Sequence, residues 1–192
     1  MAVDLEPITR EITGLVDRVR DDQLDGPTPC AEMTVRELLA HLAQLSVGFR
    51  MLAQKQETPG GPRPTELPAD WRESMPRALN ELADAWQVPA AWEGTVALFG
   101  QEMPGAMAGQ IATDELVLHG WDLARAIGAP YQVDEPALRA AHAWVVATAE
   151  RTGGKGQEGL FGPPVPVADD APLLDRVVAL AGRTPTWTAD DA

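Results

Sequence analysis

Residues 115–122 read Glu-Leu-Val-Leu-His-Gly-Trp-Asp, and their spacing is that of a helix with one polar stripe. Glu115, His119 and Asp122 are the only charged or imidazole side chains of this stretch. At about 100° per residue, all three emerge from the same side of a helix. The three residues 116–118 cover most of the remaining circumference with hydrocarbon. We therefore predict a central helix whose polar stripe faces the interior of the protein.

A buried carboxylate needs a compensating positive charge, because an unpaired charge in an apolar interior is very costly. A divalent cation would supply that charge. The chain has three histidines, and His41 lies on the apolar face of a second predicted helix, between Leu38 and Leu45. If the two helices pack face to face, His41 meets Glu115 and His119. Three protein ligands with one position left open are typical of catalytic zinc sites.

The overall composition excludes several classes of partner. The chain has 192 residues, enough for one domain with a sizeable core, and a formal net charge of −14, which disfavours nucleic acid and acidic membranes. No apolar run approaches the ~20 residues of a membrane-spanning helix. The N-terminal residues lack the pattern of an export signal, so we expect a cytoplasmic location. The single cysteine, Cys30, excludes an internal disulfide and leaves nitrogen and oxygen as the metal ligands.

Apolar residues recur at intervals of three and four along most of the chain, which predicts helices near 4–22, 34–56, 74–86, 104–127, 134–152 and 170–181. Thr34 and Glu37 form a capping-box pattern at the start of the second helix, and Asp134 is a plausible N-cap for the fifth. The short apolar stretch 95–100 receives no assignment. We predict an all-α fold, a four-helix bundle with additional C-terminal helices, as a single domain over residues 1–192.

Three segments together resemble a known family. They are TPCAEMTVRELLAHL at 28–42, ELVLHGWDLARA at 115–126 and FGPPV at 161–165. These segments resemble actinobacterial proteins of the mycothiol-dependent maleylpyruvate isomerase type, which belong to the DinB-like metal-binding bundles. The resemblance covers nearly the whole chain. It implies an up-down four-helix bundle of DinB-like type that holds a divalent metal through His41, Glu115 and His119.

The same resemblance implies zinc as the usual metal, with nickel as the alternative, and an open coordination position for a low-molecular-weight thiol such as mycothiol. It also implies a second, sterol-carrier-like domain in the full isomerases, which this chain is too short to contain. The expected partners are therefore a small-molecule thiol and an electrophilic substrate. A homodimer remains open.

Other residues have both a functional and a plain structural interpretation. Asp122 is our candidate catalytic group: it either moves protons, orients a ligand histidine, binds the metal or pairs with Arg125. Trp121 and Arg125 are candidates for binding the thiol cofactor, although core packing and compensation of the helix dipole explain them equally well. Cys30 is more often a small packed side chain than a nucleophile. His142 is expected at the rim of the bundle rather than among the ligands.

Three functional hypotheses follow from the sequence. The first is a metal- and thiol-dependent isomerase or S-transferase, in which the cation lowers the pKa of the thiol so that thiolate predominates near neutral pH. The second is a non-catalytic metal-binding module for a stress response or for sensing. The third is a helical bundle without metal that serves mainly in dimerisation. Two measurements distinguish these three hypotheses: the metal content of the protein, and any change in the absorption spectrum of the bound metal when a thiol is added.

Overall fold

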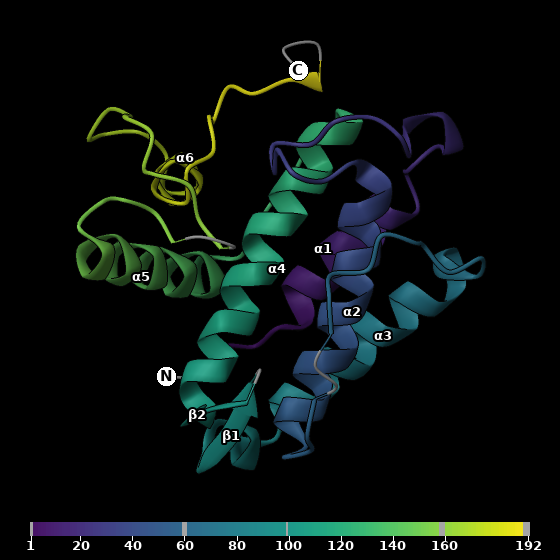
Figure 1. Ribbon diagram of the computed structural model, residues 1–192, viewed down its shortest axis with the longest axis vertical. Coiled ribbons are helices and arrows are strands. Elements are labelled where there is room, and N and C mark those ends of the chain that lie inside the picture. Colours follow the sequence, from purple (N-terminus) through teal and green to yellow (C-terminus); the bar gives the residue numbers. More distant parts are fainter. Residues whose placement is uncertain (1, 59–60, 99, 158–159, 190–192) are drawn as a thin grey trace.

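The computed structural model describes residues 2–58, 61–98, 100–157 and 160–189. Six α-helices and one small hairpin make up most of its regular structure (Figure 1). The helices are α1 (Glu6–Val16), α2 (Val35–Ala53), α3 (Trp71–Gln87), α4 (Gly105–Ile127), α5 (Glu135–Thr152) and α6 (Leu173–Leu180). The strands are β1 (Thr95–Leu98) and β2 (Gln101–Pro104), which pair antiparallel. Two short 3-10 turns, Asp21–Gln23 and Pro89–Trp92, complete the elements. The predicted all-α, DinB-like class is confirmed.

The first four helices form the bundle. Both α1 and α2 pack against α3 and α4, so α2 and α4 share a long contact face. Figure 1 shows α5 and α6 on the opposite side of α4 from α2 and α3, so α4 is the central element. This position explains its composition, since most of its residues are buried, including the acidic residues Asp114 and Asp122. None of the described helices is long and apolar enough to span a membrane.

The predicted helix caps are confirmed. The backbone N–H of Glu37 donates to Thr34 Oγ1 at 3.3 Å, and the backbone N–H of Thr34 donates to the Glu37 carboxylate at 2.8 Å. The Asp134 carboxylate accepts from the backbone N–H of Ala137 at 3.3 Å. Gly128 ends α4 with a φ of 68°, a left-handed conformation that glycine adopts without strain. These local signals fix where α2 and α5 begin and where α4 ends.

Some element boundaries differ from the sequence pattern, and one unassigned stretch contains a strand. Helix α1 ends at Val16, but Val19 is still buried. The apolar spacing therefore continues past the end of the helix and predicts a helix that is too long. Helix α3 begins at Trp71, three residues before the start that Pro76 suggests. A proline in this position removes one hydrogen bond to the preceding turn, but the helix continues through it, with Trp71 buried at its start. The unassigned stretch 95–100 contains β1, while Phe99 lies outside the described residues.

One close approach fixes the path of the chain after α4. The Tyr131 hydroxyl donates to the Val117 carbonyl at 2.9 Å, and the Tyr131 ring lies directly over Gly120. A Cβ at position 120 would lie 2.9 Å from Tyr131 Cε2. Glycine in the central helix therefore lets the segment between α4 and α5 pack against the same turn that carries His119.

Candidate metal centre

The packing of α2 against α4 brings together the three residues predicted as metal ligands. His41 Nε2 lies 3.8 Å from Glu115 Oε2, and His119 Nε2 lies 3.1 Å from the same oxygen. The two imidazole rings meet edge to face, with centroids 5.0 Å apart. One ligand atom from each of the three residues falls within 4.8 Å of the others. With metal–ligand bonds of about 2.0–2.1 Å in tetrahedral geometry, ligand atoms lie roughly 3.3 Å apart, so the donor set fits a small divalent cation.

A carboxylate behind His119 fixes the orientation of its ring. His119 Nδ1–H donates to Asp122 Oδ2 at 3.0 Å, which leaves Nε2 directed toward Glu115. Asp122 has no exposed surface. This is the carboxylate–histidine arrangement that commonly supports a metal ligand from behind. His41 has no matching support, because its buried Nδ1 lacks a hydrogen-bond partner among the described residues.

Arg183 neutralises the carboxylate that orients His119. Its Nη2 donates to Asp122 Oδ2 at 2.9 Å, and its Nε donates to Asp122 Oδ1 at 3.2 Å. Arg183 also donates to the Ala181 carbonyl at 3.0 Å, and the residue is only 6% exposed. The sequence analysis missed this residue. Arg183 belongs to no periodic apolar pattern that would place it near the site. The alternative pairing of Asp122 with Arg125, which the sequence left open, does not form.

The electrostatics of the cluster suit a cation. Burial opposes protonation of His119, but the hydrogen bonds to Asp122 and Glu115 outweigh the effect of burial and raise the pKa of His119 to about 9. Burial also opposes ionisation of Glu115, yet the interactions of its carboxylate with the imidazoles of His119 and His41 lower its pKa. Burial lowers the pKa of His41, so this imidazole is neutral near pH 7. In the metal-free protein, a proton on His119 thus supplies the positive charge that the two flanking carboxylates require.

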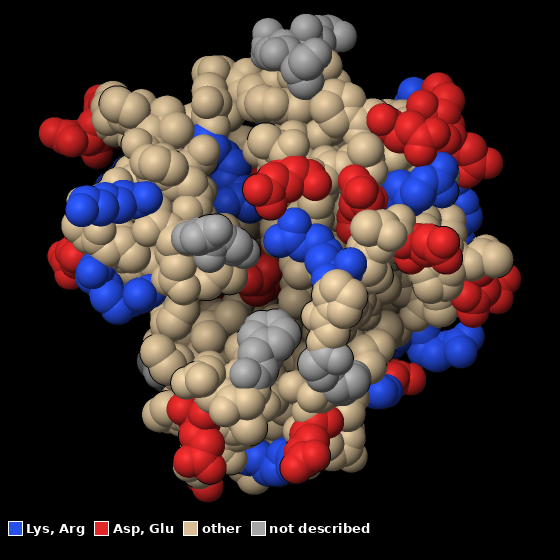
Figure 2. All heavy atoms as spheres, in the orientation of Figure 1, with Lys and Arg blue, Asp and Glu red and all other residues tan. Residues whose placement is uncertain are grey.

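The three candidate ligands line one side of a large cavity of about 1220 Å3. Cys30, Asp114 and Arg183 line it as well. Figure 2 shows this face of the molecule hollowed near its centre, with acidic atoms visible in the depth of the hollow. A space of this size between a bundle and its appended helices has the dimensions of a small-molecule site.

Asp114 is a second residue that the sequence analysis missed. It is 1% exposed, and its Oδ1 has no hydrogen-bond partner among the described residues. Burial, together with the negative charge of Glu115, raises the pKa of Asp114 well above its ordinary value. No local pattern distinguishes it from a surface aspartate, because its burial depends on the tertiary packing around α4.

Cys30 also lies close to the centre, within the same 4.8 Å limit of His119 and Asp122. Burial, with the negative charge of Asp122, raises the pKa of Cys30 to about 11. The side chain is therefore a neutral thiol near pH 7, in agreement with a packing role.

The other candidate residues lie elsewhere. Trp121 is 4% exposed and packs in the hydrophobic core. The Arg125 guanidinium lies over the Trp121 ring, and its Nε donates to the Trp187 carbonyl at 2.9 Å. Neither residue lines the cavity. Asp122 does not line it either, and its carboxylate contacts His119, which does line it.

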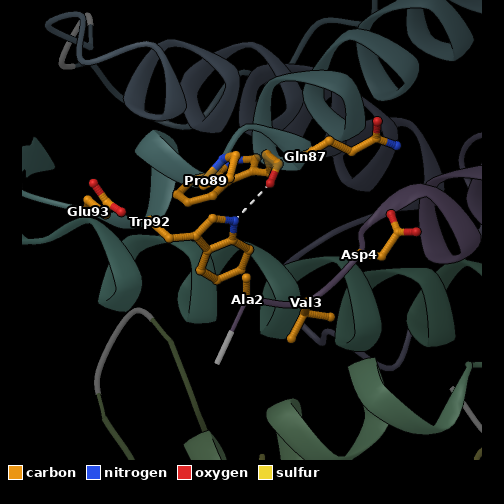
Figure 3. A pocket seen from close by; sticks show the side chains of 8 residues that line it. Ala2, Val3, Asp4, Gln87, Pro89, Trp92 and Glu93 are labelled. Carbon is orange, nitrogen blue, oxygen red and sulfur yellow. Dashed lines mark hydrogen bonds between the residues drawn. The ribbon is translucent and has the colours of Figure 1, made fainter.

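A smaller hollow of about 400 Å3 lies beside the N-terminal segment (Figure 3). The Trp92 indole N–H donates to the Trp86 carbonyl at 2.8 Å in its wall. Its two carboxylates, Asp4 and Glu93, lie at opposite ends of the view, so they form no shared ligand set. The larger cavity, which contains the convergent donors, is therefore the candidate functional site.

Comparisons with known proteins agree with this architecture. Two uncharacterized proteins of Mycobacterium tuberculosis, from strains CDC 1551 / Oshkosh and ATCC 25618 / H37Rv, are each 31% identical to this chain over 173 residues, which is 88% of this chain and 90% of theirs. Among solved structures, a mycothiol-dependent maleylpyruvate isomerase superimposes with a TM-score of 0.68 at 20% identity, over 95% of this chain and 88% of the isomerase chain. A mutant of the isomerase gives the same TM-score at 21% identity, over 94% of this chain and 87% of that chain. The likeness in fold thus includes the C-terminal helices as well as the bundle.

The family assignment rests on a sequence match. Residues 5–124, which run from the start of the bundle through both ligand-bearing helices, match the family model of the mycothiol maleylpyruvate isomerase N-terminal domain. The family that the sequence motifs suggested is therefore confirmed. This chain belongs to the mycothiol maleylpyruvate isomerase N-terminal domain family.

Proposed function

We propose that this protein is a metal- and thiol-dependent isomerase or S-transferase, with His41, Glu115 and His119 as its metal ligands. The observation that carries the proposal is the convergence of these three donors within 4.8 Å at the wall of a large cavity. Zinc suits two imidazoles and a carboxylate with one position open, and nickel is the alternative. The family of the chain supports mycothiol as the thiol cosubstrate.

A divalent cation in this site would coordinate the sulfur of the thiol and lower its pKa, so that thiolate predominates near neutral pH. The charges of the chain favour an anion in the open position. Glu115, Asp122 and Arg183 together carry one net negative charge, so a dication leaves one net positive charge to be matched. A thiolate matches that charge, whereas a neutral thiol does not.

The roles of the remaining residues follow from their contacts. Asp122 holds His119 in the tautomer that presents Nε2 to the site, and Arg183 holds Asp122 in place. Asp122 is thus a positioning residue. The neutral Cys30 thiol does not compete with the cosubstrate as a nucleophile near pH 7. A cytoplasmic location, where low-molecular-weight thiols stay reduced, fits this chemistry.

Metal analysis with matched variants tests the first half of the proposal. We expect about one equivalent of zinc or nickel per chain after reconstitution, and loss of that metal in His41→Ala, Glu115→Gln and His119→Ala. His142→Ala is the control, because His142 does not line the cavity. Reconstituted protein without stoichiometric metal, or with metal that these variants retain, would refute the proposed ligand set.

Thiol chemistry tests the second half. In the cobalt-substituted protein, mycothiol should change the visible spectrum, and the zinc or nickel form should catalyse mycothiol-dependent turnover of maleylpyruvate or another electrophile. A cobalt spectrum that no thiol changes, combined with a chelator-induced fall in melting temperature, would instead identify a non-catalytic metal-binding module.

A further inference from the structure

The cavity beside the metal centre has one wall without charge. We call this the hairpin wall and define it by six residues: Leu45, Val47, Leu98, Met103, Met107 and Ile111. They come from the second half of α2, from the β1–β2 hairpin and from the first turns of α4. Among the described residues that line the cavity, none is charged in α2 from Leu45 onward, in the hairpin, or in α4 up to Ile111. In a protein with 29 acidic and 15 basic residues, an uncharged wall of this extent is a distinct feature.

The charged lining residues lie elsewhere around the same cavity. Arg151 comes from α5 and Arg183 from the segment after α6, while Glu32 and Arg63 come from the segments that flank α2. Asp114 and Glu115 follow the hairpin wall along α4. The cavity therefore has a polar region that includes the metal centre and an apolar region toward the hairpin.

The two regions adjoin through both ligand-bearing helices. On α2, Leu45 lies one helical turn from His41, in the direction of the hairpin. On α4, Ile111 lies one turn from Glu115 and Met107 lies two turns from it, again toward the hairpin. At 1.5 Å per residue, the wall begins about 6 Å from the metal ligands and extends to about 12 Å. A molecule held with its reactive atom at the metal centre would reach this wall with a group of several carbons.

Two residues of the wall are unusually exposed. Val47 and Met107 are each 40% exposed, and both are among the few large apolar side chains that the described structure leaves in contact with water. Because burial of apolar surface is favourable by about 25 cal/mol per Å2, an apolar occupant gains by covering them. Exposed apolar surface that borders a small-molecule cavity commonly marks a binding site.

We propose that the hairpin wall binds an alkyl or aryl group of the electrophilic substrate, so that this chain acts on apolar electrophiles. The inference rests on the proposed function and names its substrate class. With an α,β-unsaturated ketone, a bond forms between the thiol sulfur and the β-carbon, and the proton released by the thiol ends on the α-carbon. This addition needs no oxidant or reductant.

A homologous series of substrates tests the proposal. With zinc-loaded protein and mycothiol, kcat/KM should rise by about 4-fold per added methylene from methyl to propyl to pentyl vinyl ketone, as expected when about 0.8 kcal/mol is gained per buried methylene. Met107→Glu, which places a charge on the wall, should reduce this dependence to less than about 2-fold. Val88→Glu is the control, because Val88 is 53% exposed but does not line the cavity.

A binding measurement separates this proposal from the proposed function. Saturated alkyl ketones should bind the metal-free protein and displace the dye anilinonaphthalenesulfonate from it. The affinity of the ketone should rise with each added methylene, and Met107→Glu should abolish this rise. If kcat/KM stays constant or falls with chain length, the apolar substrate class is wrong, while the proposed thiol-dependent function is unaffected. Chain-length-dependent binding without any thiol-dependent turnover would uphold the hairpin wall as an apolar subsite and refute the proposed enzymatic function.

Discussion

Arg183 forms a buried two-point ion pair with Asp122, a residue 61 positions earlier in the chain. The pair joins the segment after α6 to the central helix directly behind the candidate metal ligand His119. Replacement of Arg183 by methionine should destabilise the fold by about 3–5 kcal/mol, because it removes the guanidinium that neutralises the buried Asp122 charge and leaves only His119 in contact with it. Denaturant unfolding measures this loss.

Two further variants isolate the cause. Arg139→Met removes an ion pair on the surface of α5 and should have little effect, since that pair is largely exposed. The double variant Asp122→Leu with Arg183→Met should recover much of the stability, because it removes both charges together. A double variant no more stable than Arg183→Met would contradict the ion-pair explanation.

Metal binding should tighten as the pH rises toward 9. His119 must lose its proton before Nε2 can bind a cation, and its flanking carboxylates raise the pKa of His119 to about 9. Protons therefore compete with the metal below this pH, while above it the affinity should level off. Isothermal titration of zinc in buffers of different ionisation enthalpy should detect the release of about one proton per metal near pH 7. A titration without proton release would refute the charged state of His119.

Asp114→Asn should stabilise the metal-free protein near neutral pH. Burial and the charge of Glu115 raise the pKa of Asp114, so the folded state holds this proton more tightly than the unfolded state. Stability contributed by that proton is present at low pH and declines as the pH rises above about 4, the ordinary value for an aspartate. The melting temperature of Asp114→Asn should exceed that of the wild type by an amount that grows with pH. Asp84→Asn, on the exposed face of α3, is the control and should show no such growth.

Cys30 should react slowly with alkylating reagents. Burial raises the pKa of Cys30 from 9.0 to about 11, so the thiolate fraction near pH 7 is about 100-fold lower than for a thiol of ordinary pKa. Iodoacetamide labelling followed by mass spectrometry, with N-acetylcysteine as the reference thiol, measures the rate. Labelling as fast as the reference would show that the thiol is activated, contrary to the role proposed above.

Gly109→Ala should destabilise the bundle by about 1–3 kcal/mol, the usual cost of an added methyl group in a packed interior. A Cβ at this position in α4 would meet the rings of Trp92 and Trp86, the latter at 2.8 Å. Gly14→Ala in α1 is the matched control, because its Cβ would meet nothing within 4 Å. We expect this control to be stabilising by about 0.5–1 kcal/mol, the helix propensity difference between alanine and glycine. Thermal unfolding of both variants checks the difference in sign.

Local patterns in the sequence were enough to predict the six helices and the shared stripe of Glu115 and His119. Helical periodicity and caps such as Thr34 and Asp134 act over a few residues, so they can be recognised without a fold. The same periodicity placed His41 on the apolar face of its helix. It did not fix where Trp121 and Arg125 lie relative to the cavity, because neighbours on one helix point in different directions.

Which charges are buried, and what compensates them, became clear from the packing of the folded chain. Arg183 reaches Asp122 across 61 residues, and Asp114 is buried although nothing in its local sequence indicates it. The hairpin wall likewise combines side chains from three separate segments. Burial and charge pairing depend on what packs against a residue from elsewhere in the chain, and no spacing along one helix encodes that contact.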